Sequence, residues 1–182
     1  FLLWPGIFNL EISYLSIRIS SVIIVGLILF FTCKIIYLFS DKKESLLLSI
    51  PLILFFSFTK DPDFLHFTNE MVSILLIISS LYIYLKNYNQ LSFQQLFSIS
   101  FLLGSVLFAK MQFFPVACIL VFAINMRVLF KDKSIKNFLV SSIGFILPAG
   151  MISIYYLAND ELKDLFYNVI YFPLSDFFSR NE

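Results

Sequence analysis

The chain has 182 residues, of which 59% are hydrophobic, 19% aromatic and only 14% charged, and its formal net charge is +1. A soluble domain has about 25% charged residues, whereas the mean hydropathy of this chain is +0.89. These values exclude an ordinary soluble domain and give no indication of nucleic-acid binding. We expect an all-α, polytopic bundle of transmembrane helices that is part of a longer protein.

Apolar runs divide the chain into three parts. We expect residues 1–16 to lie at the membrane interface, because Pro5, Gly6 and Glu11 interrupt an apolar segment that contains Trp4. Residues 17–157 are expected to form the helical bundle, and residues 158–182 to begin an external loop. About six spans are predicted in the bundle: 17–38, 45–58, 71–85, 96–109, 113–130 and 138–157.

Three of these spans have notable composition. The run 45–58 contains Pro51 and is shorter than the roughly 20 residues of a typical crossing, yet the charges on either side require it to cross. In the run 96–109, Gly104 and nearby serines predict close helix packing; these serines are Ser98, Ser100 and Ser105. In the run 138–157, Gly144, Pro148 and Gly150 predict a kink.

Charge differs between the two ends of the predicted helices. One face carries three acidic residues and eight basic ones: Lys34, Lys42, Lys43, Lys86, Arg127, Lys131, Lys133 and Lys136. The opposite face has five basic and nine acidic residues. The positive-inside rule makes the first face cytoplasmic. We therefore expect residues 59–70, 110–112 and 158–182 to lie outside together.

The chemistry-bearing residues collect on the predicted outer face. They are Arg18, Asp61, Asp63, His66, Glu70 and Lys110. Lys110 and Arg18 at helix ends can bind a lipid phosphate, or they can simply extend to the interface. Glu70 can serve chemistry, or it can stabilise a helix N-terminus. His66, between Phe64 and Phe67, is a base or an interfacial side chain.

No metal site is predicted. The chain has one histidine and two cysteines. Cys33 and Cys118 lie in apolar runs and are interpreted as small packing residues. We expect no cofactor, although a requirement for a divalent metal stays open.

Several motifs resemble the GT-C superfamily of glycosyltransferases. The run LGSVLFAKMQ at 103–112 is similar to a motif of the bacterial branch that includes protein mannosyltransferases and the lipid A aminoarabinose transferase. Leu3-Trp4-Pro5 with Arg18-Ile19-Ser20-Ser21, Asn69-Glu70-Met71 and the tail at 162–173 add to the resemblance. The chain departs from the family at Glu11, often glycine there, and at Ala109, usually threonine.

The resemblance implies a GT-C-like membrane enzyme that moves a sugar from a polyprenyl-phosphate donor to a glycan, lipid or protein acceptor. It implies transfer at the outer face of a bacterial inner membrane, with the catalytic carboxylate upstream of Phe1. Lys110 and Arg18 would bind the donor phosphate. Five residues would position substrate: Asp61, Asp63, His66, Glu70 and Gln112.

Two other functions stay open. A transporter or flippase for a lipid-linked glycan or another anion would place charges within the spans, where this sequence has no Asp or Glu. A structural membrane subunit would need no chemistry at all. The sequence upstream of the chain would discriminate the enzyme from the transporter.

Overall fold

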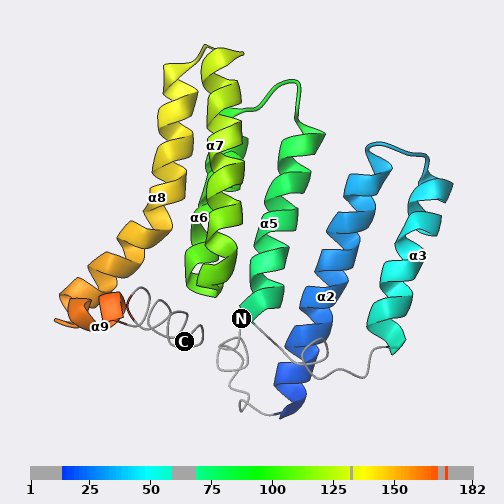
Figure 1. The fold of residues 1–182 in the computed structure, drawn as a ribbon, viewed down its shortest axis with the longest axis horizontal. Helices are drawn as coiled ribbons and strands as arrows, with labels where there is room; N and C mark the ends of the chain where they lie inside the picture. Colours follow the sequence, from blue (N-terminus) through cyan, green and yellow to red (C-terminus); the bar gives the residue numbers. More distant parts are fainter. Residues whose placement is uncertain (1–13, 59–68, 132, 168–170, 172–182) are drawn as a thin grey trace, which may run out of the picture. The chain divides into compact units, whose positions relative to one another are not determined.

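The computed structural model describes residues 14–58, 69–131, 133–167 and 171. These residues form helices and short turns, with no strand among them (Figure 1). The chain divides into two compact units, Phe1–Gln90 and Leu91–Glu182. The predicted all-helical class is therefore confirmed.

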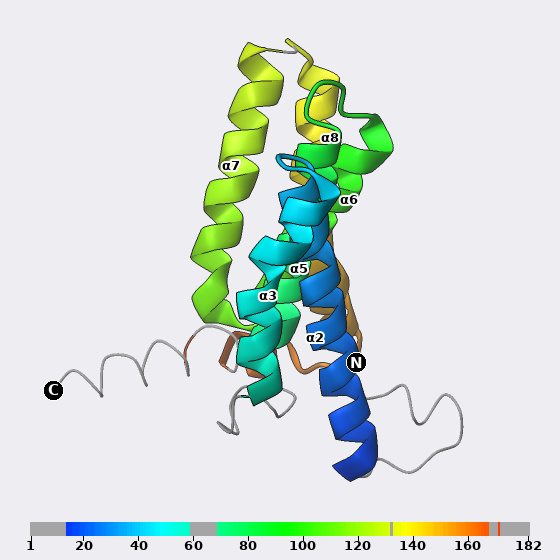
Figure 2. The same cartoon turned by 90° about the vertical axis from the view of Figure 1, so that its right-hand side faces the viewer.

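The described residues of the first unit form three helices. They are α2 (Tyr14–Tyr37), α3 (Lys42–Phe58) and α5 (Asn69–Lys86). The chain reverses between α2 and α3, which run antiparallel side by side (Figures 1 and 2).

Helices α2 and α5 pack in parallel. Near their first turns, the hydroxyl of Ser21 lies 3.8 Å from the sulfur of Met71. Two to three turns further along both helices, the rings of Phe31 and Tyr82 are 5.6 Å apart. Because residue numbers increase in the same direction along both helices, α2 and α5 begin at the same end of the unit. Between these two contacts lies an apolar core that contains Ile24, Ile28, Met71 and Leu75.

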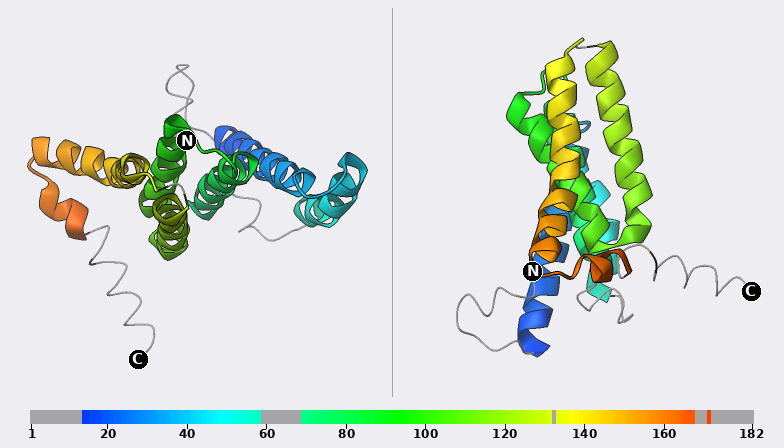
Figure 3. Two further views of the ribbon diagram at one scale, coloured as in Figure 1. Left: turned by 90° about the horizontal axis from the view of Figure 1, so that it is seen from above. Right: turned by 90° about the vertical axis from the view of Figure 1, so that its left-hand side faces the viewer.

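In the described part of the second unit, three long helices are followed by a short one. Its elements are α6 (Phe93–Ala109), the 3-10 turn η1 (Met111–Phe113), α7 (Phe114–Phe130), α8 (Ile135–Ala158) and α9 (Leu162–Phe166). Helices α7 and α8 run side by side from the turn that joins them (Figure 3, right). Figure 1 shows α8 bending in its second half, the region for which Pro148 and Gly150 predict a kink.

Helices α6 and α8 are parallel and unusually close. The hydroxyls of Ser100 and Ser141 are 2.7 Å apart, and Gly104 lies directly against the backbone of Phe145. A Cβ added at Gly144 would meet the carbonyl oxygen of Phe97 at 2.9 Å. Small residues therefore allow backbone contact, as they do in membrane helix pairs.

The close packing predicted for α6 is confirmed at two of its four small residues. Ser100 and Gly104 face α8. Ser98 is exposed, and Ser105 donates to the carbonyl of Phe101 within its own helix.

Local signals explain where the helices begin. Ser92 and Gln95 form a capping box, in which the Gln95 N–H donates to Ser92 Oγ at 3.3 Å and the Ser92 N–H donates to Gln95 Oε1 at 3.0 Å. The Ser134 side chain accepts from the Asn137 N–H at the start of α8. Pro115 occupies the first turn of α7, where its missing N–H costs nothing. These caps place helix starts before the apolar runs that follow them.

Burial follows the pattern of a protein in lipid. Among the described residues, the buried polar side chains are ten serines and Asn125, whereas large apolar side chains such as Phe122 and Ile146 are more than 60% exposed. Many of the buried hydroxyls bond to their own helix; Ser20 donates to the Ser16 carbonyl at 2.8 Å and Ser49 to the Ser45 carbonyl at 2.7 Å. Because lipid solvates apolar side chains well, these can face outward. Small polar residues then occupy the contacts between helices.

Four helical segments are long and apolar enough to cross a membrane. They are Leu15–Tyr37, Asn69–Lys86, Met111–Phe130 and Ile135–Ala158. Helices α3 and α6 have 17 residues each, which gives a length of about 26 Å against a hydrocarbon core of about 30 Å. Among the described residues, four such helices indicate a membrane protein. The predicted six spans are not confirmed, because α3 and α6 are shorter than a typical crossing.

Candidate functional site

Two predicted site residues lie at one end of the parallel pair α2 and α5. Arg18 is exposed and precedes Ser21 by one turn, and Glu70 immediately precedes Met71. The Ser21–Met71 contact therefore brings the guanidinium and the carboxylate to the same end of two packed helices. Glu70 is half-buried in the first turn of α5, where the positive end of the helix favours a carboxylate.

Two other predicted residues share the connection between α6 and α7. Lys110 has an extended backbone (φ −158°, ψ 119°) and ends α6, and its N–H donates to the Val106 carbonyl at 3.0 Å. The Lys110 carbonyl in turn accepts from the Phe113 N–H at 3.1 Å. Lys110 is half-buried, whereas Gln112 in η1 is exposed. This tight connection fixes the backbone of Lys110 without a flexible loop.

The remaining predicted residues are not placed. Asp61, Asp63 and His66 lie outside the described residues, as does the segment 59–68 that contains them. The structure thus joins Arg18 with Glu70 in the first unit and Lys110 with Gln112 in the second.

The chemistry available at these helix ends is anion binding. A guanidinium and an ammonium can both bind phosphate oxygens through charge-assisted hydrogen bonds. Glu70 can accept a hydrogen bond from a hydroxyl group. Within the part of the chain that the structure describes, no three His, Cys, Asp or Glu residues gather as a metal site.

The sequence did not predict a cavity at the other end of α2. Lys34 and Lys42 line a cavity between α2 and α3, although their charges were interpreted only as markers of membrane orientation. The available signal was the spacing of Phe30, Lys34 and Tyr37, which places the three residues on one face of a helix.

Comparison with known proteins does not assign a family. No protein-family model, curated protein or solved structure matches this chain. The fold therefore defines the class, a helical membrane protein.

Proposed function

We propose that this chain forms the membrane core of a glycosyltransferase that moves a sugar from a polyprenyl-phosphate donor to an acceptor at the outer face. The observation that carries the proposal is the position of Arg18 and Glu70 at one end of a parallel helix pair. A cation for the donor phosphate and a carboxylate for a hydroxyl group are the two charges that such a transfer uses. The resemblance of residues 103–112 to the GT-C superfamily supports the same reading.

Chain order predicts on which side of the membrane Lys110 lies. If α2, α3, α5 and α6 each cross the bilayer in turn, the start of α2, the start of α5 and the end of α6 emerge on one side. Arg18, Glu70 and Lys110 then share one aqueous face. The positive-inside rule makes that face the outer one, because Lys34, Lys42, Lys43 and Lys86 lie at the opposite helix ends.

The proposed reaction is a single displacement at the anomeric carbon. The acceptor oxygen forms a bond to this carbon as the bond to the donor phosphate oxygen breaks, and the bonding electrons leave with the polyprenyl phosphate. A carboxylate in the loop that the family resemblance places before Phe1 takes the acceptor proton. Lys110 and Arg18 stabilise the charge that grows on the departing phosphate, and Glu70 orients a substrate hydroxyl.

The test is transfer from a radiolabelled polyprenyl-phosphate sugar in membranes that contain the full-length protein. Lys110→Ala and Arg18→Ala should each lower kcat/KM about 10- to 100-fold, because each removes a cation that acts on the leaving group. Lys86→Ala is the matched control, since it removes the same charge at the opposite end of α5. Wild-type transfer by Lys110→Ala would remove this lysine from the mechanism.

One observation favours the rival transporter or flippase. In the described residues, each unit has three long helices, of which the first and third run parallel. Transporters are often built from internal repeats of this kind. A flippase would move a labelled lipid-linked glycan across proteoliposome membranes without any acceptor, whereas the transferase would consume the donor only with one.

A further inference from the structure

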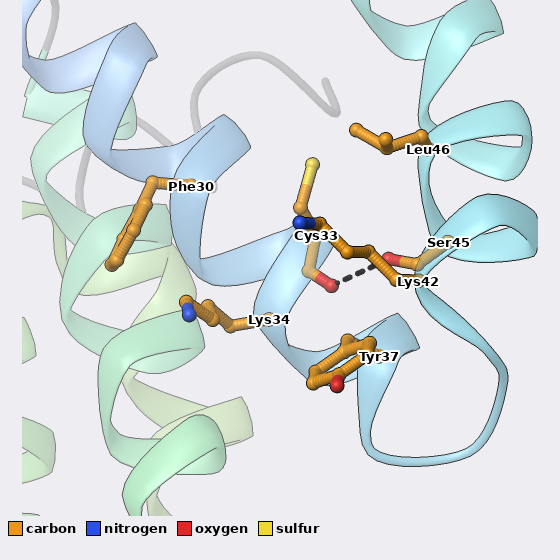
Figure 4. Close-up of a pocket in the computed structure, with 7 residues that line it drawn as sticks. All are labelled: Phe30, Cys33, Lys34, Tyr37, Lys42, Ser45 and Leu46. Atoms are coloured by element: carbon orange, nitrogen blue, oxygen red, sulfur yellow. Dashed lines mark hydrogen bonds between the residues drawn. The ribbon is translucent and has the colours of Figure 1, made fainter.

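The first unit contains a cavity of about 350 Å³ between the end of α2 and the start of α3. Its apolar wall includes Phe30, the ring of Tyr37 and Leu46, and its charged lining consists of Lys34 and Lys42 (Figure 4). Small-molecule sites in proteins have volumes of about 300–1,000 Å³, so this cavity is large enough for part of a ligand.

Hydrogen bonds between the two helices fix one side of the cavity. Ser45 Oγ donates to the Cys33 carbonyl at 2.9 Å, and Cys33 Sγ donates to Ser49 Oγ at 3.0 Å. Ser45 and Ser49 are both buried. The separation of α2 and α3 is therefore set by specific contacts, and the cavity is a built feature of this helix pair.

The cavity carries positive charge that carboxylates do not neutralise. Among the described residues, neither Lys34 nor Lys42 forms an ion pair. The Lys34 ammonium lies 5.5 Å from the centre of the Phe30 ring. Figure 4 shows Lys42 extending from α3 towards α2. A lining with two lysines and several apolar side chains fits a ligand that has both an anionic group and an apolar part.

We propose that this cavity binds the phosphate headgroup of an anionic phospholipid. Lysine binds phosphate oxygens as a point charge, and basic pockets between membrane helices bind lipid headgroups. The apolar wall favours a lipid over free phosphate, because it offers contact to the first carbons of the acyl chains. The site is separate from the proposed active site, since Lys34 is about 24 Å along α2 from Arg18.

The experiment is native mass spectrometry of the full-length protein in detergent, titrated with phosphatidylglycerol or with phosphatidylcholine of the same chain length. The wild type should retain phosphatidylglycerol in preference to phosphatidylcholine. We expect each lysine that contacts the phosphate headgroup to strengthen binding of the anionic lipid about fivefold. The double variant Lys34→Gln/Lys42→Gln should therefore retain this lipid about 25-fold less tightly.

The matched control is Lys43→Gln/Lys86→Gln, which removes the same charge at the start of α3 and the end of α5. Neither residue lines the cavity, and Lys86 lies 5.8 Å from the Tyr82 ring. This control should keep wild-type retention, and an equal loss in both double variants would overturn the proposal by reducing it to general surface charge.

Two further measurements distinguish binding of a lipid from binding of free phosphate. Leu46→Trp fills the apolar wall without changing charge, so it should weaken phosphatidylglycerol retention, and unaltered retention would contradict the assigned cavity. An excess of inorganic phosphate should leave the lipid bound, whereas displacement would identify a free-phosphate site. Circular dichroism of each variant shows whether its helices are intact, so that loss of lipid is not mistaken for loss of fold.

Discussion

The contact between Gly104 and Phe145 allows a quantitative prediction for Gly104→Ala. The added Cβ would lie 2.9 Å from the Phe145 carbonyl carbon and 3.2 Å from its Cα, and closer still to the carbonyl oxygen. These are backbone atoms of α8, so no side chain can rotate away. Helices α6 and α8 must separate, which also lengthens the 2.7 Å contact between Ser100 and Ser141.

Two opposing effects determine how Gly104→Ala changes the free energy of unfolding. Overpacking a tight contact costs about 1–3 kcal/mol, while replacing helical glycine with alanine returns about 1 kcal/mol. We therefore expect Gly104→Ala to lower the free energy of unfolding by up to about 2 kcal/mol. Gly150→Ala on α8 is the matched control, because no atom lies within 4 Å of its added Cβ; it should be neutral or raise stability by up to about 1 kcal/mol.

The assay is pulse proteolysis of the purified protein along an SDS titration, which gives the folded fraction at each step. Gly104→Ala should unfold at a lower SDS fraction than the wild type and than Gly150→Ala. If Gly104→Ala matched or exceeded the stability of Gly150→Ala, the close approach of α6 and α8 would be wrong.

Two smaller predictions concern hydroxyl groups. A double-mutant cycle of Ser100→Ala and Ser141→Ala should give a coupling energy of about 0.6 kcal/mol in the same assay, the average for hydrogen bonds between membrane helices; zero coupling would contradict the 2.7 Å contact. Ser92→Ala should cost about 1 kcal/mol because it removes the capping box of α6. The control Ser98→Ala removes an exposed hydroxyl from the same helix and should have little effect; equal losses from the two would count against the cap.

The helices themselves could be predicted from apolar runs, but most of their starts were predicted too late. One helix was predicted to begin at residue 45, whereas α3 starts at Lys42. Another was predicted to begin at residue 96, whereas α6 starts at Phe93. Both first turns contain polar side chains, Lys43 and Glu44 in α3 and Gln94 and Gln95 in α6. Polar side chains are favoured there because the first N–H groups of a helix have no partner within it. Hydropathy identifies apolar residues only, so it places the start of such a helix after its polar first turn.

Helix pairing could not be predicted, because serine occurs on both contact and lipid-facing surfaces. Ser98 and Ser100 are two residues apart and point to different sides of α6, yet only Ser100 meets α8. Composition does not distinguish the two. The same limit applies to the candidate site, since the position of Arg18 beside the start of α5 depends on which helices pack in parallel.

The central claim is that the candidate site residues at three helix ends share one aqueous side. Cysteine labelling tests it in a variant whose native Cys33 and Cys118 are replaced with serine. Single cysteines at Asn69 and Gln112 report the end of the Arg18–Glu70 pair and the connection that contains Lys110, and both positions are exposed.

Exposed Lys43 and Lys133 serve as reference positions on the predicted cytoplasmic side. A membrane-impermeant maleimide should label the cysteines at 69 and 112 in intact cells, and those at 43 and 133 only after the membrane is opened. Labelling of position 112 from the side opposite to position 69 would separate Lys110 from Glu70 across the bilayer and contradict the proposed sugar-transfer site.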